Sequence, residues 1–325
     1  MLNYIIRRIL YAVPIIIGVL IITFILFFHV FSPRHIAVQI LGEKARPAAI
    51  QNWIEQHDLD KPYYFNPEAE GAGILTDTLL FKHVTGMLAF SFGNSFSDEK
   101  PISAKLKKRA VPSLLITLPI FVCGLVISIS LSLFFAFFRG TYIDRTGMFF
   151  SVLLMSVSIL IYIIFLQWLL SSAWHLFPVS GWSSGLHVVH FMVLPFIIGI
   201  TGALGGEIRF YRIIMLEETS KEYIRTARAK GVKESAILFK HILKNALIPI
   251  LTNTVMRIPY LFIGSLLLEN FFGIPGLGSF TITAFQNGDF QSLKAIVFLG
   301  AVLYQVGIIL TDISYSLADP RVVFE

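Results

Sequence analysis

Long runs without any charged residue alternate with short polar segments along this chain. No Lys, Arg, Asp or Glu occurs in residues 9–33 or 110–138, and residues 248–268 and 293–317 are also largely apolar. A helix needs about 20 apolar residues to cross the hydrocarbon core of a bilayer. Each of these four runs therefore predicts one membrane-spanning helix.

The longest charge-free run lies between Arg145 and Glu207 and is far too long for one spanning helix. Its middle reads "AWHLFPVSGWSSGLHVVH", in which Pro178, Gly181 and Gly185 are helix breakers. We therefore predict two helices joined by a short loop, which brings the count to six. The predicted fold class is an all-α polytopic membrane protein with six transmembrane helices.

The distribution of basic residues predicts the orientation of these helices. Four segments fall on one side of a six-span chain: the N-terminus with "RR", "RGTYIDR", the charged block 207–244, and "DPRVVFE". They are net basic, which is typical of cytoplasmic loops. We expect both termini to be cytoplasmic and a long loop after the first helix to be external, despite the basic residues near Arg109, because long loops are largely exempt from this rule.

These boundaries predict three regions. Residues 1–31 form the first transmembrane helix, residues 32–109 an external loop or cap, and residues 110–325 a five-helix core with a cytoplasmic loop at 207–247. The first run is longer than a signal-peptide core and no small-residue cleavage site follows it, so we expect an uncleaved helix.

Composition supports a membrane protein and excludes other classes. Of the 325 residues, 55% are hydrophobic and only 14% are charged, against about 25% charged in soluble proteins. The net charge of +6 is explained by basic cytoplasmic loops that face membrane lipid, and not by nucleic-acid binding. The single cysteine, Cys123, excludes a disulfide framework and a cysteine-based metal site.

The block between the fourth and fifth spans contains the stretch "YIRTARAKGVKESAILFKH". Thr219 and Glu222 have the spacing of a capping box, which predicts a helix start. Gly231 suits the left-handed position that ends a helix, and a second helix is expected from Lys233. Its predicted apolar face consists of Ala236, Phe239, Ile242, Leu243 and Ala246. A basic amphipathic segment of this kind can rest on anionic lipid or bind a protein, and the residues alone leave both readings open.

This stretch resembles the cytoplasmic signature of ABC-transporter permeases of the di- and oligopeptide importer family. Arg225, Thr226 and Ala227 stand in the register of that signature's Glu-Ala-Ala, and Gly231 matches its glycine. Further similar segments follow in the family's order: "IIRRIL", "SFGNSF", "FPVSGW", "GSLLLENFFGIPGLG" and "DISYSLADPR". The resemblance covers essentially the whole chain.

The resemblance implies a permease subunit that forms half of a translocation route for peptides in a bacterial or archaeal cytoplasmic membrane. Its implied partners are a second homologous permease, two cytoplasmic ATPase subunits and an external substrate-binding protein. The loop would be the coupling helix that contacts an ATPase. The implied coupling residues are Tyr223, Arg225, Thr226, Ala227, Arg228, Lys230 and Gly231.

The chain carries no nucleotide-binding signature of its own. A P-loop needs a Gly-Lys pair, and this dipeptide is absent from the sequence. We therefore expect a non-catalytic subunit with no cofactor, and ATP and magnesium on partner subunits. "GWSSG" matches a nucleophile elbow around Ser183, but that motif needs a preceding strand and a triad. His187 and His190 could chelate a metal, yet interfacial packing is the favoured reading and no metal site is expected.

Three charges within the spans are candidate residues of the translocation route: Arg257, Glu269 and Asp312. An intramembrane charge costs at least about 2.5 kcal/mol on insertion scales, so it should face a partner or a wet cavity. For Arg257 we weigh substrate contact equally with an ion pair to a neighbouring helix or subunit. For Glu269 and Asp312 a structural or gating role is favoured.

Three classes of function remain from the sequence. The favoured one is the permease of an ATP-driven importer. A secondary transporter would need a coupling acid deep in the membrane, and an intramembrane hydrolase would use Ser183.

Overall fold

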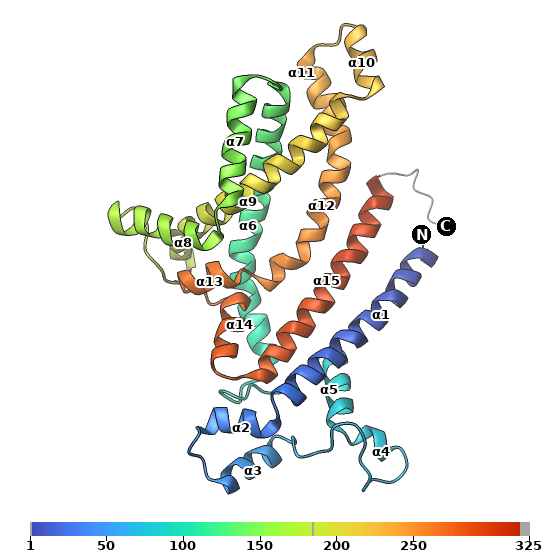
Figure 1. The fold of residues 1–325 in the computed structure, drawn as a ribbon, viewed down its shortest axis with the longest axis vertical. Helices are drawn as coiled ribbons and strands as arrows, with labels where there is room; N and C mark the ends of the chain where they lie inside the picture. The colour runs from blue at the N-terminus through green and yellow to red at the C-terminus, as the bar shows by residue number, and fades with distance from the viewer. Residues whose placement is uncertain (1, 184, 319–325) are drawn as a thin grey trace.

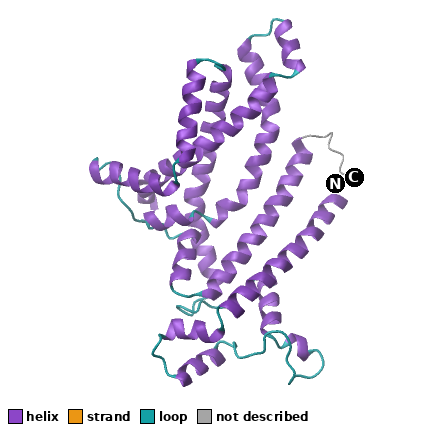
Figure 2. Ribbon diagram, in the orientation of Figure 1, coloured by secondary structure: helices purple, strands orange, loops and turns teal. Residues whose placement is uncertain are grey.

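The computed structural model describes residues 2–183 and 185–318, and these residues form helices and loops without strands (Figures 1 and 2). Several helices contain π or 3₁₀ turns, at Leu26–Val30, Trp168–Ala173, Gly185–His187 and Ile237–Leu243. The α-helices are α1 (Leu2–Ile25), α2 (Pro33–Leu41), α3 (Pro47–Gln56), α4 (Gly73–Thr76), α5 (Leu79–Leu88), α6 (Ile102–Phe137), α7 (Tyr142–Ser156), α8 (Ile159–Gln167), α9 (Val188–Thr219), α10 (Glu222–Ala229), α11 (Glu234–Ala236), α12 (Lys244–Ile263), α13 (Leu266–Phe272), α14 (Leu277–Gln286) and α15 (Phe290–Ala318).

Five helical stretches among the described residues are long and apolar enough to cross a membrane. They are Ile6–Val30, Ile102–Phe137, Val188–Thr219, Glu234–Phe272 and Phe290–Ile313. A sixth span is obtained only if α7 and the helix after it, Ile159–Ala173, are one span bent by 94°. The prediction of an all-α polytopic membrane protein is confirmed, and the count is five or six.

The bend that separates α7 from α8 has a local cause. Val157 adopts an extended conformation, and the Ser158 hydroxyl accepts a hydrogen bond from the backbone N–H of Leu160, at 3.4 Å, which starts a new helix. The Tyr162 hydroxyl then donates to the carbonyl of Leu154 across the bend, at 2.7 Å. The third span expected from the sequence therefore consists of two helices at nearly a right angle.

The segments that were predicted to share one side of the membrane lie toward one end of the molecule (Figure 1). The start of α1, the turn between α6 and α7, helices α10 and α11, and the end of α15 all point toward the upper end of the view. Helices α2–α5 lie at the opposite end. The long helices connect these two ends and pack as neighbours, α6 against α9 and α12 against α15.

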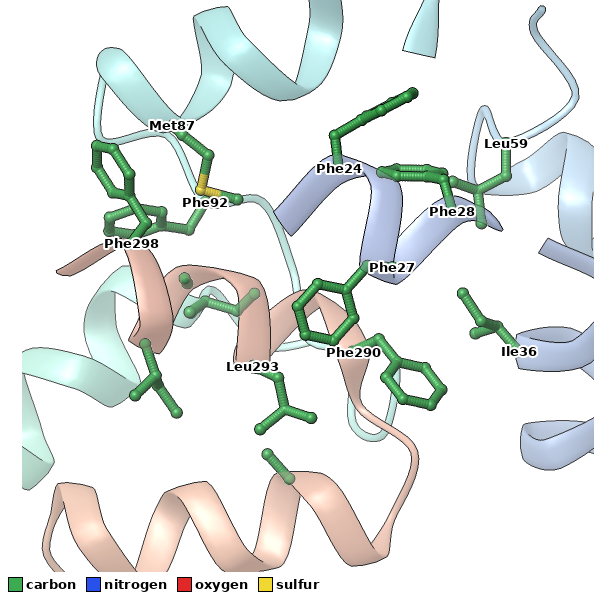
Figure 3. Packing of buried hydrophobic residues seen from close by; sticks show 14 of the residues in the cluster. Phe24, Phe27, Phe28, Ile36, Leu59, Met87, Phe92, Phe290, Leu293 and Phe298 are labelled. Atoms are coloured by element: carbon green, nitrogen blue, oxygen red, sulfur yellow. The ribbon is translucent and has the colours of Figure 1, made fainter. Parts of the chain in front are cut away.

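The loop after the first span is folded into helices α2–α5, which we call the cap. Its core is continuous with the ends of α1 and α15 (Figure 3). Phe24 of α1, with Phe27 and Phe28 of the π-helical turn that follows it, packs with Met87 of the cap and Phe290 of α15. Burial of such large side chains contributes about 1.5–3 kcal/mol each, so the cap is fixed to α1 and α15 by apolar packing.

The fifth span, Glu234–Phe272, is interrupted before its end. Helix α12 stops at Ile263 and not near Leu268, because Gly264 takes a positive φ of 81° and interrupts the helix. The chain restarts as α13, where the Ser265 hydroxyl accepts a hydrogen bond from the N–H of Leu268, at 3.4 Å. We call the region where α12, α13, α14 and α6 meet the glycine junction.

Candidate functional site: the loop between α9 and α12

The corner of this loop is a regular helix end built on one glycine. Gly231 has a φ of 73° and follows Lys230, the C-cap residue of α10. The N–H of Gly231 donates to the carbonyl of Arg228 at 2.9 Å, and the N–H of Val232 donates to the carbonyl of Ala227 at 3.2 Å. This pair of bonds defines a Schellman motif. The left-handed glycine predicted at the corner is confirmed.

The capping box predicted at the start of α10 is absent. Thr219 belongs to the end of α9, and its hydroxyl donates to the carbonyl of Leu216 at 2.6 Å. The residue before α10 is Lys221, whose side chain makes no capping hydrogen bond. The prediction of a capping box was wrong because α9 continues through Thr219, and the Thr219 side chain therefore bonds within α9.

The apolar face of the segment after Gly231 is shifted relative to the prediction. Ile237 and Leu238 are buried, whereas Ala236 is exposed and Phe239 is 62% exposed. Residues Ile237–Leu243 form a π-helix, and its wider turn rotates the helix relative to the 3.6-residue period assumed from sequence. Ile242 and Ala246 are buried as predicted.

Helix α10 packs its apolar face against the ends of α6, α9 and the π-helix. Ile224 is fully buried and Ala227 nearly so, in a cluster with Tyr211 and Met215 of α9. The other residues implied in coupling are exposed: Tyr223, Arg225, Thr226, Arg228, Lys230 and Gly231. Ala227 thus lies on the inner side of α10, and the remaining six lie on the surface.

The exposed surface of the loop is basic. Residues 220–233 contain five basic residues and one acid. Arg225 pairs with Glu222 at 2.8 Å, and Arg228 makes a two-pronged contact with Glu234 at 2.7 and 3.2 Å. These pairs are exposed and stabilise the loop by only about 0–1 kcal/mol each, so breaking them costs little.

Tyr223 connects three segments of the loop. Its hydroxyl donates to the carboxylate of Glu218 at the end of α9 and accepts from the Asn245 amide of α12, at 3.0 Å. Burial, and then the neighbouring Glu218 carboxylate, raise the pKa of Tyr223 to about 12. This residue therefore joins the two long helices to α10 as a neutral phenol.

Arg257 of α12 pairs with an acid on a neighbouring helix. Its guanidinium donates to Glu207 of α9, and Glu207 accepts a second hydrogen bond from Ser128 of α6, at 2.8 Å. Glu207 is buried, while the Arg257 side chain is 41% exposed. Of the two roles considered for Arg257, the ion pair with a neighbouring helix is therefore present. Contact of its exposed part with a substrate stays a prediction.

Glu269 lies at the centre of the glycine junction and is fully buried. Its carboxylate accepts hydrogen bonds from the Ser113 hydroxyl at 2.7 Å, the Ser265 N–H at 3.1 Å and the Ser279 N–H at 3.0 Å. The side chain thus joins α6, α13 and α14, and its oxygens are engaged by the protein itself.

Asp312 of α15 pairs with Arg8 of α1, at 3.0 Å. The sequence reasoning named Asp312 but not its partner, and it missed a second pair completely. Arg212 of α9 contacts Asp144 of α7 through two bonds of 2.7 Å, and Asp144 also accepts from the N–H of Gly140 in the turn before α7. Asp144 and Arg212 lie in segments already assigned to loops, so nothing in the local pattern marked them as partners.

The motifs that suggested other chemistry are not assembled into a site in the described residues. Ser183 lies in a loop without a preceding strand, and no hydrogen bond joins it to a histidine or an acid there. His187 and His190 belong to no group of three metal-binding side chains in the described part of the chain. The segment "DPRVVFE", which the sequence placed on the cytoplasmic side, lies outside the described residues.

A bundle of long apolar helices, with an exposed basic helix at one end and a folded cap at the other, defines an integral membrane protein. Comparison with known families identifies it further: residues 128–324 match the family of binding-protein-dependent transport system inner membrane components. Residues 1–118 match the N-terminal domain of the same membrane components. The chain belongs to this family, and it is a multi-pass permease of the cytoplasmic membrane.

Curated relatives are similar over almost the whole chain. The oligopeptide transport system permease protein AppB of Bacillus subtilis is 31% identical over 330 residues, with 99% of both chains covered. The dipeptide transport system permease protein DppB of Alkalihalophilus pseudofirmus is 28% identical, and the glutathione transport system permease protein GsiC of Salmonella paratyphi A is 27% identical, both with 99% of each chain covered.

Proposed function

We propose that this chain is the permease subunit of an ATP-driven importer for short peptides, and that α10 is the element that couples it to a cytoplasmic ATPase. The observation that carries this proposal is the exposed basic surface of α10 on a corner that connects two spanning helices. The whole-length similarity to permeases named for oligopeptides, dipeptides and glutathione supports the substrate class.

The proposed complex contains a second homologous permease, two ATPase subunits that hold ATP and magnesium, and an external substrate-binding protein. The end of the molecule with α10 then faces the cytoplasm and the cap faces outside. Arg228 and Lys230 meet carboxylates of the ATPase, and the buried Ile224 transmits its movement to α9 and the π-helix because it packs between them.

The structure suggests how the coupling can be separated from folding. A Cβ added at Gly231 meets no atom within 4 Å, so its cost is backbone strain at the positive φ and not a clash of that Cβ. Gly231→Val in the assembled complex, reconstituted in proteoliposomes, should reduce ATP-driven peptide uptake about tenfold, a size typical of coupling between two sites. ATP hydrolysis should continue, and Gly231→Ala should give a smaller defect.

The complex isolated from its native membrane provides the decisive measurement. Two ATPases and a second permease should co-purify with the chain, and uptake should require ATP. Uptake that follows a proton or sodium gradient without ATP would instead show a secondary transporter. Labelling of Ser183 by a serine-directed active-site probe, lost in Ser183→Ala, would show a hydrolase.

A further inference from the structure

Helix α5 of the cap has an exposed apolar face. The helix contains ten residues and is therefore too short to cross a membrane. His83 and Met87 are buried on its inner side, whereas Phe81 and Leu88 on its outer side are 42% and 51% exposed. Phe90, just after the helix, is also 51% exposed. The position of α5 along the two spans beside it determines what this face contacts.

The contact of α5 with α1 gives a first measure of its depth (Figure 1). Nε2 of His83 lies 3.2 Å from the Thr23 hydroxyl. Thr23 precedes Val30, the cap end of the span Ile6–Val30, by seven residues, which is about 10 Å along the helix. This span of 25 residues is about 37 Å long against a hydrocarbon core of about 30 Å, so each end extends about 4 Å beyond the core. The contact with His83 therefore lies about 6 Å inside the core.

The contact with α15 gives a second, independent measure. The rings of Phe90 and Phe298 are 5.8 Å apart. Phe298 follows Phe290, the cap end of the span Phe290–Ile313, by eight residues, which is about 12 Å along the helix. This span of 24 residues is about 36 Å long and extends about 3 Å beyond each side of the core, which places this contact about 9 Å inside it.

The segment that contains α5 enters and leaves the membrane on the same side. At its start, the N–H of Leu80 donates to the carbonyl of Tyr63 at 3.1 Å, and the Tyr63 ring lies 5.2 Å from that of His29, near the cap end of α1. After the helix, the carbonyl of Phe92 accepts from the Gln291 amide of α15 at 2.9 Å, one residue from the cap end of that span. The deepest point lies between these two boundary contacts.

The polar groups at the deep end of α5 are satisfied within the chain. The carbonyl of Gly86 accepts the N–H of Ser91, and the carbonyl of Thr85 accepts the N–H of Ala89, both at 2.9 Å. The Thr85 hydroxyl donates to the carbonyl of Phe81 at 2.7 Å. A backbone at hydrocarbon depth needs internal partners of this kind, because lipid chains offer none.

The position of Lys82 is compatible with this depth. Lys82 lies in the first turn of α5, at the shallow end of the helix. Its ammonium pairs with Asp58, in the turn that follows α3, at 2.8 Å. Long basic side chains near a membrane boundary extend their charge to the polar side, so this charge stays out of the hydrocarbon core.

We propose that α5 is a re-entrant helix whose outer face, formed by Phe81, Thr85, Leu88 and Phe90, contacts the acyl chains of the lipid leaflet next to the cap. The face continues the lipid-facing surface of α1, where Ile22 is 67% exposed at the same depth. The cap is then held by lipid as well as by its packing on α1 and α15. This inference does not depend on the proposed coupling to an ATPase.

Spin-label accessibility of the full chain in lipid nanodiscs tests this inference. In a Cys123→Ser background, Leu88→Cys carries the nitroxide, with Ile22→Cys of α1 as the lipid-facing reference and Asn52→Cys, exposed on α3, as the aqueous reference. Oxygen, which concentrates in lipid, should relax the labels at 88 and 22 more than a water-soluble nickel chelate does, and the order should reverse at 52. Stronger relaxation by the chelate at 88 would place α5 in water. Protection from both reagents would show a protein contact, such as a second copy of this chain, and either result would overturn the proposal.

Labels along the face give a second reading. From Phe81 to Leu88 the chain advances seven residues, which is about 10 Å along the helix. The ratio of relaxation by oxygen to relaxation by the chelate should therefore increase from Phe81→Cys through Thr85→Cys to Leu88→Cys. Equal ratios would mean that α5 lies flat at the interface and is not re-entrant. Because these side chains are exposed, the variants should keep the unfolding midpoint of the Cys123→Ser chain, and the measurement needs neither ATPase nor transport.

Discussion

The helical stretch 234–263 lies between two glycines with positive φ that differ in their surroundings. At Gly231, with a φ of 73°, an added Cβ meets nothing within 4 Å. At Gly264, with a φ of 81°, an added Cβ would lie 2.1 Å from the Glu269 carboxylate and 2.7 Å from the Ser113 hydroxyl. Glycine is therefore required at position 231 only because of the positive φ. At position 264 it is required because of the positive φ and because there is no room for a Cβ.

A third glycine completes the comparison. Gly276 has an ordinary φ of −97°, but a Cβ there would lie 2.2 Å from Glu269 and 2.5 Å from Ser113. Glycine is therefore required at position 276 only because there is no room for a Cβ. The junction end of the stretch is closely packed around a buried acid, whereas the α10 end is open, which suits the proposed contact of α10 with an ATPase.

Gly264→Ala should have the largest effect on stability. Backbone strain of about 1–2 kcal/mol adds to overpacking of about 1–3 kcal/mol, so the free energy of unfolding should fall by about 3 kcal/mol. The thermal midpoint of the purified chain in detergent, compared with the unchanged chain, measures this. A midpoint that does not move would show that the junction is not closely packed.

Gly276→Ala should have an intermediate effect, because it adds the clash without the strain. We expect a loss of about 2 kcal/mol. Glu269→Ala combined with Gly276→Ala should lose less than the sum of the two single changes, since removing the carboxylate removes the closer of the two clashes and leaves only that with Ser113. Strict additivity in this double-mutant cycle would contradict the contact.

Gly231→Ala should have the smallest effect of the three, about 1 kcal/mol from strain alone. The same thermal measurement provides the comparison, with Gly264→Ala as the matched change. A loss as large as that at Gly264 would mean that the α10 corner is as closely packed as the junction.

Tyr223 offers a pH test of the open end. Its pKa of about 12 is higher than the usual 10, so its contribution to stability is complete below pH 10 and is lost as pH rises through 12. The near-ultraviolet tyrosinate absorbance of the unchanged chain minus that of Tyr223→Phe should show no ionisation near pH 10 and an increase near pH 12. An ionisation near pH 10 in this difference would mean that the bond to Glu218 is absent.

The sequence predicted features that depend on local composition. Spans were found from charge-free runs, and Gly231 was found because only glycine readily adopts the left-handed position at a helix end. The bend after α7 was missed because its residues, Ser156–Val157–Ser158, include neither Gly nor Pro. The buried face after Gly231 was misassigned because the π-helix does not follow the assumed period.

Pairings between distant residues could not be predicted at all. Arg257 and Glu207 are 50 residues apart, and only the packing of α12 on α9 brings them together. The same limit applies to Lys294, which was placed in the sixth span without notice of its burial. An ammonium at the end of a span usually extends to the interface, whereas that of Lys294, a residue only 5% exposed, lies over the ring of Phe28.

The closely packed glycine junction also has a mechanical consequence. At 1.5 Å per residue, the 30 residues of 234–263 form a rod about 45 Å long. If the Gly264 end stays fixed as a pivot, a sideways shift of about 4 Å at the Glu234 end corresponds to a rotation of only about 5°. Because the side chains along the rod move less the closer they are to Gly264, Arg257 would move by about 1 Å.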